Sequence, residues 1–167
     1  VEAFGLSYGL PVVTVRPFNT FGPRQSARAI IPTIITQCLT DSRVRLGNVT
    51  PTRDLNYVSD IVEGFVRAAA SGEAMGRTIN IGSGRETRIE DLARIIAIMI
   101  DRTITIEQDE GRVRPGHSEV ERLVANNAAA RDVLGWEPSI PLEEGLRMTI
   151  DWMREHLDGY RPGVYVL

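Results

Sequence analysis

Arginine and amide side chains stand at breaks between apolar segments, where they could bind an anion. Arg16 directly follows the apolar run PVVTV, and Asn19 stands three residues later, between Arg16 and Arg24. Arg53 stands in TPTRDLNYV and Arg114 in RVRPGHSE. The planar guanidinium group presents paired N–H donors at a fixed geometry that suits phosphate. An amide at the carboxyl end of a strand, together with two such groups, could hold a diphosphate without a metal ion.

The same residues allow a simpler interpretation, which spacing alone leaves open. Arg53 could pair with Asp54 or with another neighbouring carboxylate, and the other arginines could be solvated. Asp54 and Asp60 fit an Arg partner and a helix cap better than an acid–base pair. Phe18 and Phe21 could be packing residues instead of a cofactor platform.

Other residues that often carry chemistry have poor spacing for it. His117, His156 and Cys38 lack metal-ligand spacing, so no metal site is predicted. Cys38 stands among Ile and Leu, which favours an inert core thiol. The segment GSGRE, residues 82–86, is rich in glycine but lacks the spacing of a dinucleotide fingerprint. It predicts a strand-to-helix turn.

Composition excludes several classes of function. A net charge of −3 over 167 residues argues against bulk attraction to nucleic acid or to an anionic membrane. No apolar run approaches the roughly 20 residues of a membrane span, and one cysteine allows no intrachain disulfide, so the cytoplasm is the expected compartment. All 19 basic residues are arginines, which excludes lysine chemistry, including a Tyr-x-x-x-Lys pair.

Alternating strands and helices must position these side chains. Short apolar segments predict strands at 11–15, 44–47, 78–82 and 103–108. Apolar spacing predicts helices at 1–8, 27–39, 59–72, 87–99, 127–136 and 141–157. Asp60 with Glu63, and Thr87 with Glu90, have the spacing of capping boxes. The class is α/β, but only 11–15 and 78–82 read as buried strands, so the parallel sheet is predicted to be incomplete.

Five motifs in order carry a family resemblance. RPFNTFGP, RDLNYVSD, INIGSG, RPG and NNAAARDVLGWEP resemble the second half of an extended short-chain dehydrogenase/reductase, from about Val1 to about His156. Those proteins are NAD-dependent nucleotide-sugar epimerases and 4,6-dehydratases. GPRQSARAIIPTIITQ, TPTRDLNYV and SEVERLV are most similar to bacterial UDP-N-acetylglucosamine 4,6-dehydratases.

The resemblance implies an architecture. Residues 1–27 and 58–88 would form the distal part of a Rossmann-type parallel sheet. Residues 28–57 and 89–157 would form a small α/β sugar-nucleotide-binding subdomain, and 158–167 a loose tail.

The resemblance also implies roles for individual residues. Pro17 and Phe18 match positions against the nicotinamide end of NAD. The positions that match sugar-nucleotide contacts are Asn19, Ala29, Ile30, Pro32, Leu46, Arg53, Arg114 and His117. Asn19 and the two arginines would hold the diphosphate, Leu46 would pack on the base, and 29–32 would line the base pocket. His117 stands where the family often has an acid that holds the ribose.

The implied function is the substrate-binding half of an NAD-dependent enzyme that acts on a UDP-sugar. The chain opens on what reads as the last turns of a helix, so we expect a fragment. It lacks the glycine fingerprint for NAD and the Tyr-x-x-x-Lys pair, so we expect no catalytic residue and no turnover by this chain alone. The unpaired edge of strand 11–15 predicts a homo-oligomer. The alternatives are a non-enzymatic nucleotide-sugar-binding module and an interaction protein with a vestigial pocket.

Overall fold

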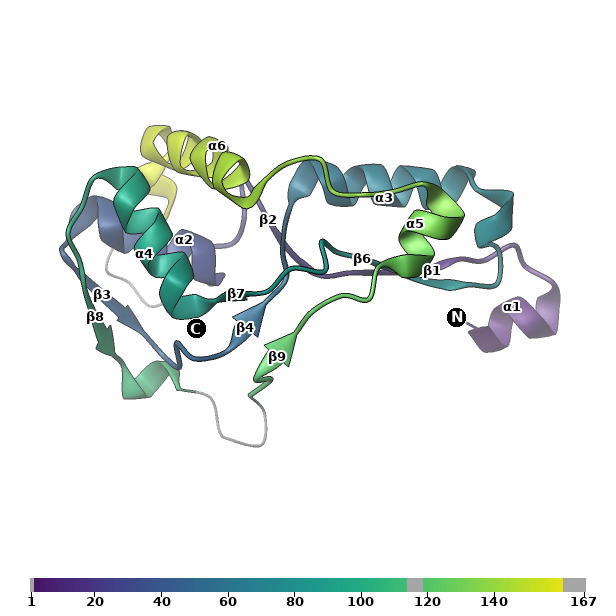
Figure 1. Ribbon diagram of the computed structural model, residues 1–167, viewed down its shortest axis with the longest axis horizontal. Coiled ribbons are helices and arrows are strands. Elements are labelled where there is room, and N and C mark those ends of the chain that lie inside the picture. Colours follow the sequence, from purple (N-terminus) through teal and green to yellow (C-terminus); the bar gives the residue numbers. More distant parts are fainter. Residues whose placement is uncertain (1, 114–118, 161–167) are drawn as a thin grey trace.

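Helices and strands alternate along the chain and form two lobes joined by a narrower middle part (Figure 1). The structure is a computed structural model that describes residues 2–113 and 119–160. The α-helices are α1 (Glu2–Tyr8), α2 (Ile30–Thr40), α3 (Val58–Ala70), α4 (Ile89–Ile100), α5 (Ala128–Leu134) and α6 (Leu142–Glu155). Short 3-10 helices span Gly72–Ala74, Glu110–Arg112 and Leu157–Tyr160.

The strands pair in short, mostly parallel sets, which confirms the α/β class. They are β1 (Thr14–Pro17), β2 (Asn19–Phe21), β3 (Arg43–Leu46), β4 (Thr52–Arg53), β5 (Leu55–Tyr57), β6 (Thr78–Ile81), β7 (Thr87–Arg88), β8 (Thr105–Gln108) and β9 (Arg122–Leu123). Parallel pairs join β1 to β6, β2 to β5 and β3 to β8. In the middle part, β4 pairs with β7 in antiparallel and with β9 in parallel orientation.

Each lobe has its own apolar core. In the larger lobe α2, α4 and α6 pack together beside β3 and β8, and fully buried core residues include Ile34, Ile35, Val44, Leu92, Ile96 and Leu146. In the smaller lobe the core consists of Ile61, Ala74, Ile79, Ile81, Ala130 and Trp136. Because α5 packs against α3 and β6 here, residues 128–136 share this core, whereas the predicted division places them with the substrate-binding subdomain.

The buried strand predicted at 11–15 lies further along the chain. Hydrogen-bonded pairing runs from Thr14 to Pro17, and its register places Arg16 beside Asn80. Residues 12–15 are only half-buried and 16–17 are exposed, because one edge and part of one face of β1 lack a partner among the described residues. The expectation of a strand covered on both faces is therefore wrong.

Both predicted capping boxes are wrong. Helix α3 begins at Val58, so Asp60 lies inside its first turn. Its carboxylate accepts hydrogen bonds from Ser139 Oγ at 2.7 Å and from the Ile140 amide at 3.0 Å. Asp60 thus ties α3 to the segment that leads into α6. Thr87 lies in β7, and α4 starts without a side-chain cap.

The described part of the segment predicted as a loose tail, residues 158–160, contributes to the larger core. Tyr160 is buried in that core, and its hydroxyl donates a hydrogen bond to the Gln25 carbonyl oxygen at 3.0 Å. Residues 161–167 lie outside the described residues.

Helix α6 approaches β2 and β5 most closely at Gly145. A Cβ atom at this position would lie 2.9 Å from ring carbons of both Phe21 and Tyr57. Gly145→Ala is therefore expected to lower the free energy of unfolding by about 1–3 kcal/mol through overpacking. Urea denaturation measures the change. The matched control is Gly72→Ala, where no atom lies within 4 Å of the added methyl group; equal losses in both variants would contradict the close packing.

Cys38 is fully buried in the larger core, as the sequence predicts. Burial raises the pKa of its thiol to about 11, and the Arg102 guanidinium opposes this only in part. Because the thiolate is the nucleophile, the folded protein at pH 8 should react very slowly with a thiol reagent. Chain unfolding in guanidinium should release one reactive thiol. Rapid modification of the folded protein would contradict this assignment.

Candidate functional site

A cavity of about 590 Å³ lies where the larger lobe meets the middle part. Its walls come from β2, the start of α2, the end of β3, β4 and β9. These elements are far apart in the sequence, and the parallel pairs β2–β5 and β3–β8 bring their ends together. Cavities of this size commonly hold small-molecule ligands.

The cavity collects most of the residues that the sequence assigns to the sugar nucleotide. Its lining includes Asn19, Ala29, Ile30, Leu46 and Arg53. The polar Asn19 and Arg53 and the apolar members thus border one space, as a ligand with a charged and an apolar part requires.

Other predicted site residues lie elsewhere. Pro32 is buried within α2 and does not line the cavity. Pro17 and Phe18 lie at the end of β1, where the Phe18 amide donates to the Ile81 carbonyl oxygen at 2.9 Å. Arg114 and His117 lie outside the described residues.

Arg53 is held firmly in the cavity wall. Its Nη1 atom donates to the carbonyl oxygens of Thr52 at 2.9 Å and Val120 at 2.6 Å. Its Nη2 atom lies 3.1 Å from Glu119 Oε1, and the two side chains are only 14% and 15% exposed. Arg53 therefore pairs with a carboxylate distant in the sequence and not with Asp54.

Asp54 anchors the segments that surround Arg53. Its side chain is 0% exposed and accepts hydrogen bonds from the amides of Ser83 (3.0 Å), Gly84 (2.9 Å) and Ala125 (3.0 Å). The Ser83 hydroxyl donates at 2.6 Å and Asn56 Nδ2 at 3.0 Å. The prediction of an Arg partner is wrong for Asp54, because backbone amides balance its charge. Three separate segments of the middle part meet at this carboxylate.

The glycine-rich turn at 82–86 is a structural junction. It leads from β6 to the two-residue strand β7 and then into α4, and its amides point at Asp54. A Cβ atom on Gly82 would lie 2.6 Å from the Ala125 Cβ atom, so the turn packs tightly against that segment. Since Asp54 already occupies the amides, these residues do not fit the pyrophosphate of a dinucleotide.

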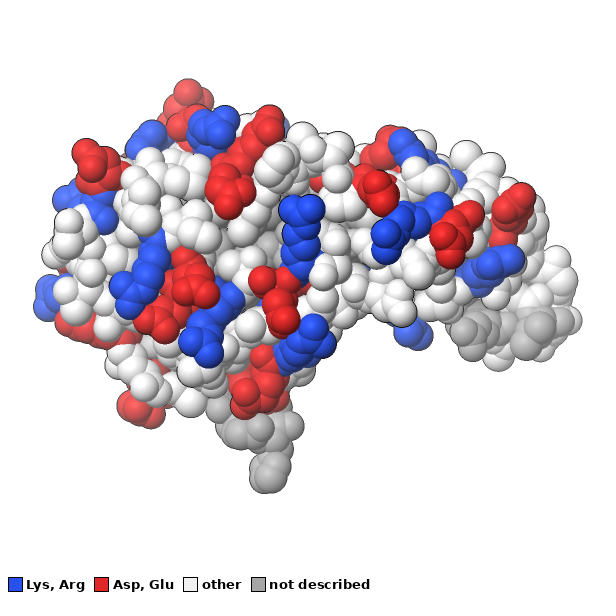
Figure 2. Space-filling model, viewed as in Figure 1, with Lys and Arg blue, Asp and Glu red and all other residues white. Residues whose placement is uncertain are grey.

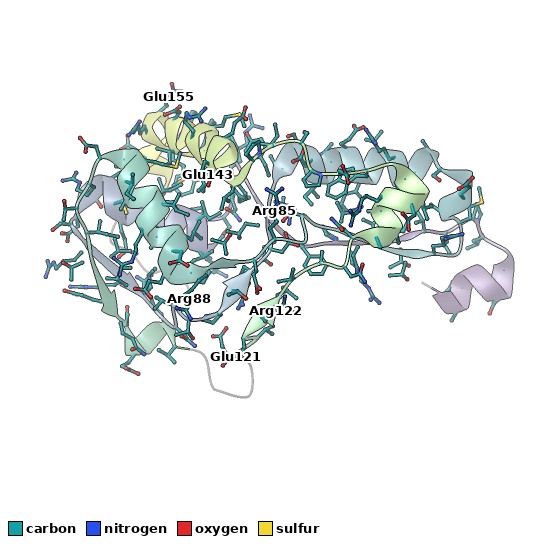
Figure 3. The ribbon with its side chains drawn as sticks, viewed as in Figure 1. Arg85, Arg88, Glu121, Arg122, Glu143 and Glu155 are labelled. Atoms are coloured by element: carbon teal, nitrogen blue, oxygen red, sulfur yellow. The ribbon has the colours of Figure 1, made fainter. Side chains whose placement is uncertain are left out.

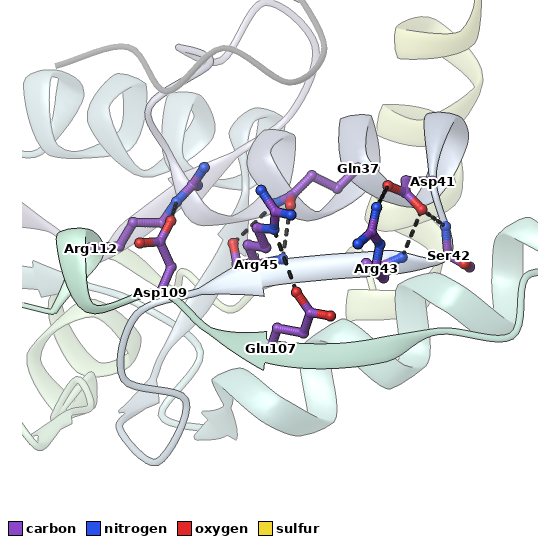
Figure 4. Close-up of polar contacts among 8 residues, drawn as sticks. All are labelled: Gln37, Asp41, Ser42, Arg43, Arg45, Glu107, Asp109 and Arg112. Atoms are coloured by element: carbon purple, nitrogen blue, oxygen red, sulfur yellow. Dashed lines mark hydrogen bonds and ion pairs between the residues drawn. The ribbon is translucent and has the colours of Figure 1, made fainter.

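Two further arginines border the cavity, and the sequence did not single them out. Arg28 precedes α2, and Arg112 closes the 3-10 helix after β8. Asp109 lies 2.8 Å from Arg112 Nε and orients that side chain, as Figure 4 shows. Figure 4 also shows Arg45 on β3 reaching Glu107 on β8, outside the cavity lining. The sequence signal for Arg112 was its place two residues before Arg114.

A second, more polar pocket of about 640 Å³ adjoins the Asp54 junction, with Ser83, Arg85, Arg122 and Arg131 in its lining. Figure 3 shows Arg85 near the junction of β6 and β7, and Arg122 on β9. Glu86 accepts from Arg122 Nε at 2.8 Å, and this hydrogen bond lowers the pKa of the Glu86 carboxyl group. Of the residues predicted for the sugar nucleotide, those that the structure describes do not line this pocket.

Charge and accessibility complete the description of the surface. Acidic and basic side chains are interspersed over both lobes on the face that Figure 2 shows.

Among residues 2–113 and 119–160, no group of three His, Cys, Asp or Glu side chains could hold a metal ion. No helix in those ranges has the length and apolar character needed to cross a membrane.

Comparison with known proteins gives consistent matches. The family model of GDP-mannose 4,6-dehydratase matches residues 1–149. The dTDP-glucose 4,6-dehydratase of Xanthomonas campestris is 31% identical over 161 residues, covering 91% of this chain. An epimerase structure from Methanothermobacter thermautotrophicus superposes with a TM-score of 0.87 and 30% identity over 97% of this chain. The structure of the Bacillus cereus UDP-glucuronic acid 4-epimerase, solved with UDP-glucuronic acid and NAD, superposes with a TM-score of 0.85. Its sequence identity is 26%, and the match covers 93% of this chain.

The chain spans about half the length of these relatives. It covers 45% of the Xanthomonas protein, 48% of the Methanothermobacter structure and 49% of the Bacillus cereus structure.

Proposed function

The chain belongs to the GDP-mannose 4,6-dehydratase family of extended short-chain dehydrogenases/reductases, and we propose that it is the nucleotide-sugar-binding half of such an enzyme. The observation that carries this proposal is the cavity that gathers Asn19, Ala29, Ile30, Leu46 and Arg53. The cavity supports this proposal because it brings together residues that lie as far apart in the sequence as Asn19 and Arg53.

The chemistry of the cavity suits a nucleoside diphosphate. Arg53 uses three of its five N–H donors on Thr52, Val120 and Glu119, which leaves two for phosphate oxygens. Arg112 adds positive charge to the same space. The apolar side chains of Ile30 and Leu46 provide a surface for the flat face of a base. Arg114 would complete the clamp around the diphosphate.

Calorimetric titration with UDP tests this binding function without any sugar. We expect saturable one-to-one binding that weakens with added salt, because guanidinium–phosphate contacts are partly screened. The proposal would be contradicted if calorimetry showed no saturable heat of binding and a fluorescence titration with UDP showed no change in signal.

UDP-sugars are the proposed ligand class within a family whose members use several nucleotides. The names of the relatives include dTDP-glucose, GDP-6-deoxy-D-mannose and UDP-glucuronic acid. Parallel titrations with UDP, dTDP and GDP should rank UDP first. A clear preference for GDP would contradict this ligand class.

NAD would serve the parent enzyme, and this chain would supply only Pro17 and Phe18 near its nicotinamide end. When bound, NAD supplies hydride transfer to the family. The Gly82–Gly84 turn does not offer its amides, and the sequence has no Lys for a Tyr-x-x-x-Lys pair. We therefore expect no NAD-dependent turnover of UDP-N-acetylglucosamine by this chain alone; measurable turnover would contradict this.

The exposed side of the smaller lobe would support self-association. Phe4 and Tyr8 on α1 are 64% and 70% exposed, and β1 pairs on one edge only within the described residues. An unpaired strand edge beside exposed apolar side chains is a template for association. We expect a dimer or larger assembly in the cytoplasm, measurable by light scattering. A monomer at micromolar concentration would contradict it.

A further inference from the structure

The second, more polar pocket carries an excess of positive charge. Among the described residues, its charged lining side chains are three guanidinium groups and one carboxylate: Arg85, Arg122, Arg131 and Glu137. They come from the turn after β6, from β9, from α5 and from the segment that follows α5. The described linings of this pocket and of the nucleotide-sugar cavity share no residue. An excess of cations around a space large enough for a small molecule favours the binding of an anion.

Arg85 is the cation in this lining that is free to meet a ligand. Its side chain is exposed, and its guanidinium group has no hydrogen bond or ion pair among the described residues. Its backbone amide donates to the Ser83 hydroxyl oxygen at 3.1 Å, which holds the turn on which Arg85 stands. The paired N–H donors of a guanidinium group match two oxygens of a phosphate group.

The other two arginines are oriented by neighbouring side chains and keep donors to spare. Arg122 Nε lies 2.8 Å from Glu86 Oε2. Arg131 Nη2 donates to Asn127 Oδ1 at 3.1 Å, and Arg131 Nε lies 3.8 Å from Glu137 Oε1. These contacts use only some of the five N–H donors that each guanidinium group has. Both carboxylates are exposed, so the ion pairs are weak and leave much of the positive charge available to a ligand.

The backbone behind the arginines is fixed by the buried Asp54 carboxylate. The amides of Ser83, Gly84 and Ala125 donate to it, and all three residues line the pocket. Asn127 Nδ2 donates to a carbonyl oxygen of the same turn at 2.8 Å, which ties the start of α5 to this wall. A wall held in this way needs no ordering when a ligand binds, which lowers the cost of binding.

We propose that this pocket is a second ligand site, which binds the phosphate group of a small phosphorylated molecule through Arg85, Arg122 and Arg131. The inference goes beyond the proposed function and does not depend on it, because the nucleotide-sugar cavity contributes no described residue to the pocket.

The rest of the lining indicates what the phosphate group is attached to. The apolar side chains among the described lining residues are those of Val124, Ala125 and Pro138, so a nucleotide base gains little here and UDP should fill the nucleotide-sugar cavity first. Asn126 and Glu137 also line the pocket, and an amide and a carboxylate can donate to and accept from hydroxyl groups. A sugar phosphate offers both a phosphate group and hydroxyl groups, whereas free inorganic phosphate offers the first alone.

An NMR titration that follows the two pockets separately tests the inference. The ¹⁵N-labelled chain is first saturated with UDP, and glucose 1-phosphate, inorganic phosphate or glucose is then added. Both phosphates should shift the signals of Asn126 and Arg131 and the Arg85 side-chain Nε–H signal, with a Kd on the order of 1 mM. Added salt should weaken this binding, and glucose should cause no shift.

Arg85→Ala supplies the decisive comparison. Since the guanidinium group has no partner among the described residues, its removal should leave the fold unchanged. It should weaken the binding of glucose 1-phosphate about tenfold, near the lower end of the range for a hydrogen bond to a charged group. Arg88→Ala is the matched control, because Arg88 is equally exposed on β7 (Figure 3), three residues further along, and does not line the pocket. It should bind glucose 1-phosphate as the wild type does.

The site would be overturned if neither phosphate shifted the Asn126 and Arg131 signals, or if the wild type and Arg85→Ala bound glucose 1-phosphate equally well. Tighter binding of glucose 1-phosphate than of inorganic phosphate would support a sugar phosphate as the ligand. Equal binding of the two would support free phosphate at the same site. If UDP does not bind, the proposed function fails, and the same titration without UDP still tests this pocket.

Discussion

Arg53→Ala is expected to weaken the binding of UDP by about 2–5 kcal/mol, the loss typical when one member of a buried charge pair is truncated. Two effects act together. The ligand loses the guanidinium donors, and Glu119, whose side chain is only 15% exposed, loses its partner and would then face the phosphates. Calorimetry with UDP measures the loss.

Arg45→Ala is the matched control for Arg53. Arg45 lies on β3, pairs with Glu107 in an exposed position, and does not line the cavity. It should change the affinity for UDP by no more than an exposed pair contributes, roughly 0–1 kcal/mol. An unchanged affinity in Arg53→Ala, with thermal unfolding showing that the variant is folded, would point to the alternative of a vestigial pocket.

Asp54→Ala is expected to lower the free energy of unfolding by about 3–5 kcal/mol, the range for loss of one partner in a buried charged contact. The substitution leaves the amides of Ser83, Gly84 and Ala125 without their acceptor in a buried position. Because these amides belong to different connections between the lobes, the loss should also loosen the middle part. Chemical denaturation measures the change in stability.

Asp151→Ala provides the comparison for Asp54. Asp151 is exposed on α6 and pairs with the exposed Arg154 at 3.3 Å, so its loss should be within roughly 1 kcal/mol. Amide exchange at Ser83, Gly84 and Ala125 adds a local readout, since all three should exchange faster in Asp54→Ala. Unchanged stability together with unchanged exchange would contradict the role of Asp54 as the junction.

Long elements with clear periodicity could be predicted from the sequence. The helix predicted at 141–157 is present as α6, and Leu146, Ile150 and Met153 on its apolar face are buried. Glycines follow the ends of α1 and α5, where Gly9 and Gly135 adopt φ of +62° and +56°, the left-handed conformation typical of helix C-caps. These features depend on neighbours within a few residues, which a single sequence displays directly.

Short strands and long-range polar contacts could not be predicted in this way. The strands β2 and β5 have three residues each, too few for a period to show, and they exist because they pair with each other. The buried carboxylates Asp54 and Asp60 have hydrogen-bond partners 71 and 80 residues away, in Ala125 and Ile140. Local spacing suggested an Arg pair and a helix cap instead.

For the candidate site, the residue types suggested an anion, and the family resemblance supplied the list of residues. The structure then showed which of them share a cavity. The partner of Arg53 is Glu119, 66 residues away, which spacing could not identify. Gln25, which lines the cavity, was missed because its sequence neighbours suggest only a loop.

An NMR titration of the ¹⁵N-labelled chain with UDP tests the central claim most directly, because it distinguishes the proposed cavity from the second, more polar pocket. Binding in the proposed cavity should shift the amide signals of Asn19, Ile30, Leu46 and Arg53 and leave those of Arg85 and Arg131 nearly unchanged. Shifts confined to Arg85 and Arg131, or no shifts at saturating UDP, would contradict it.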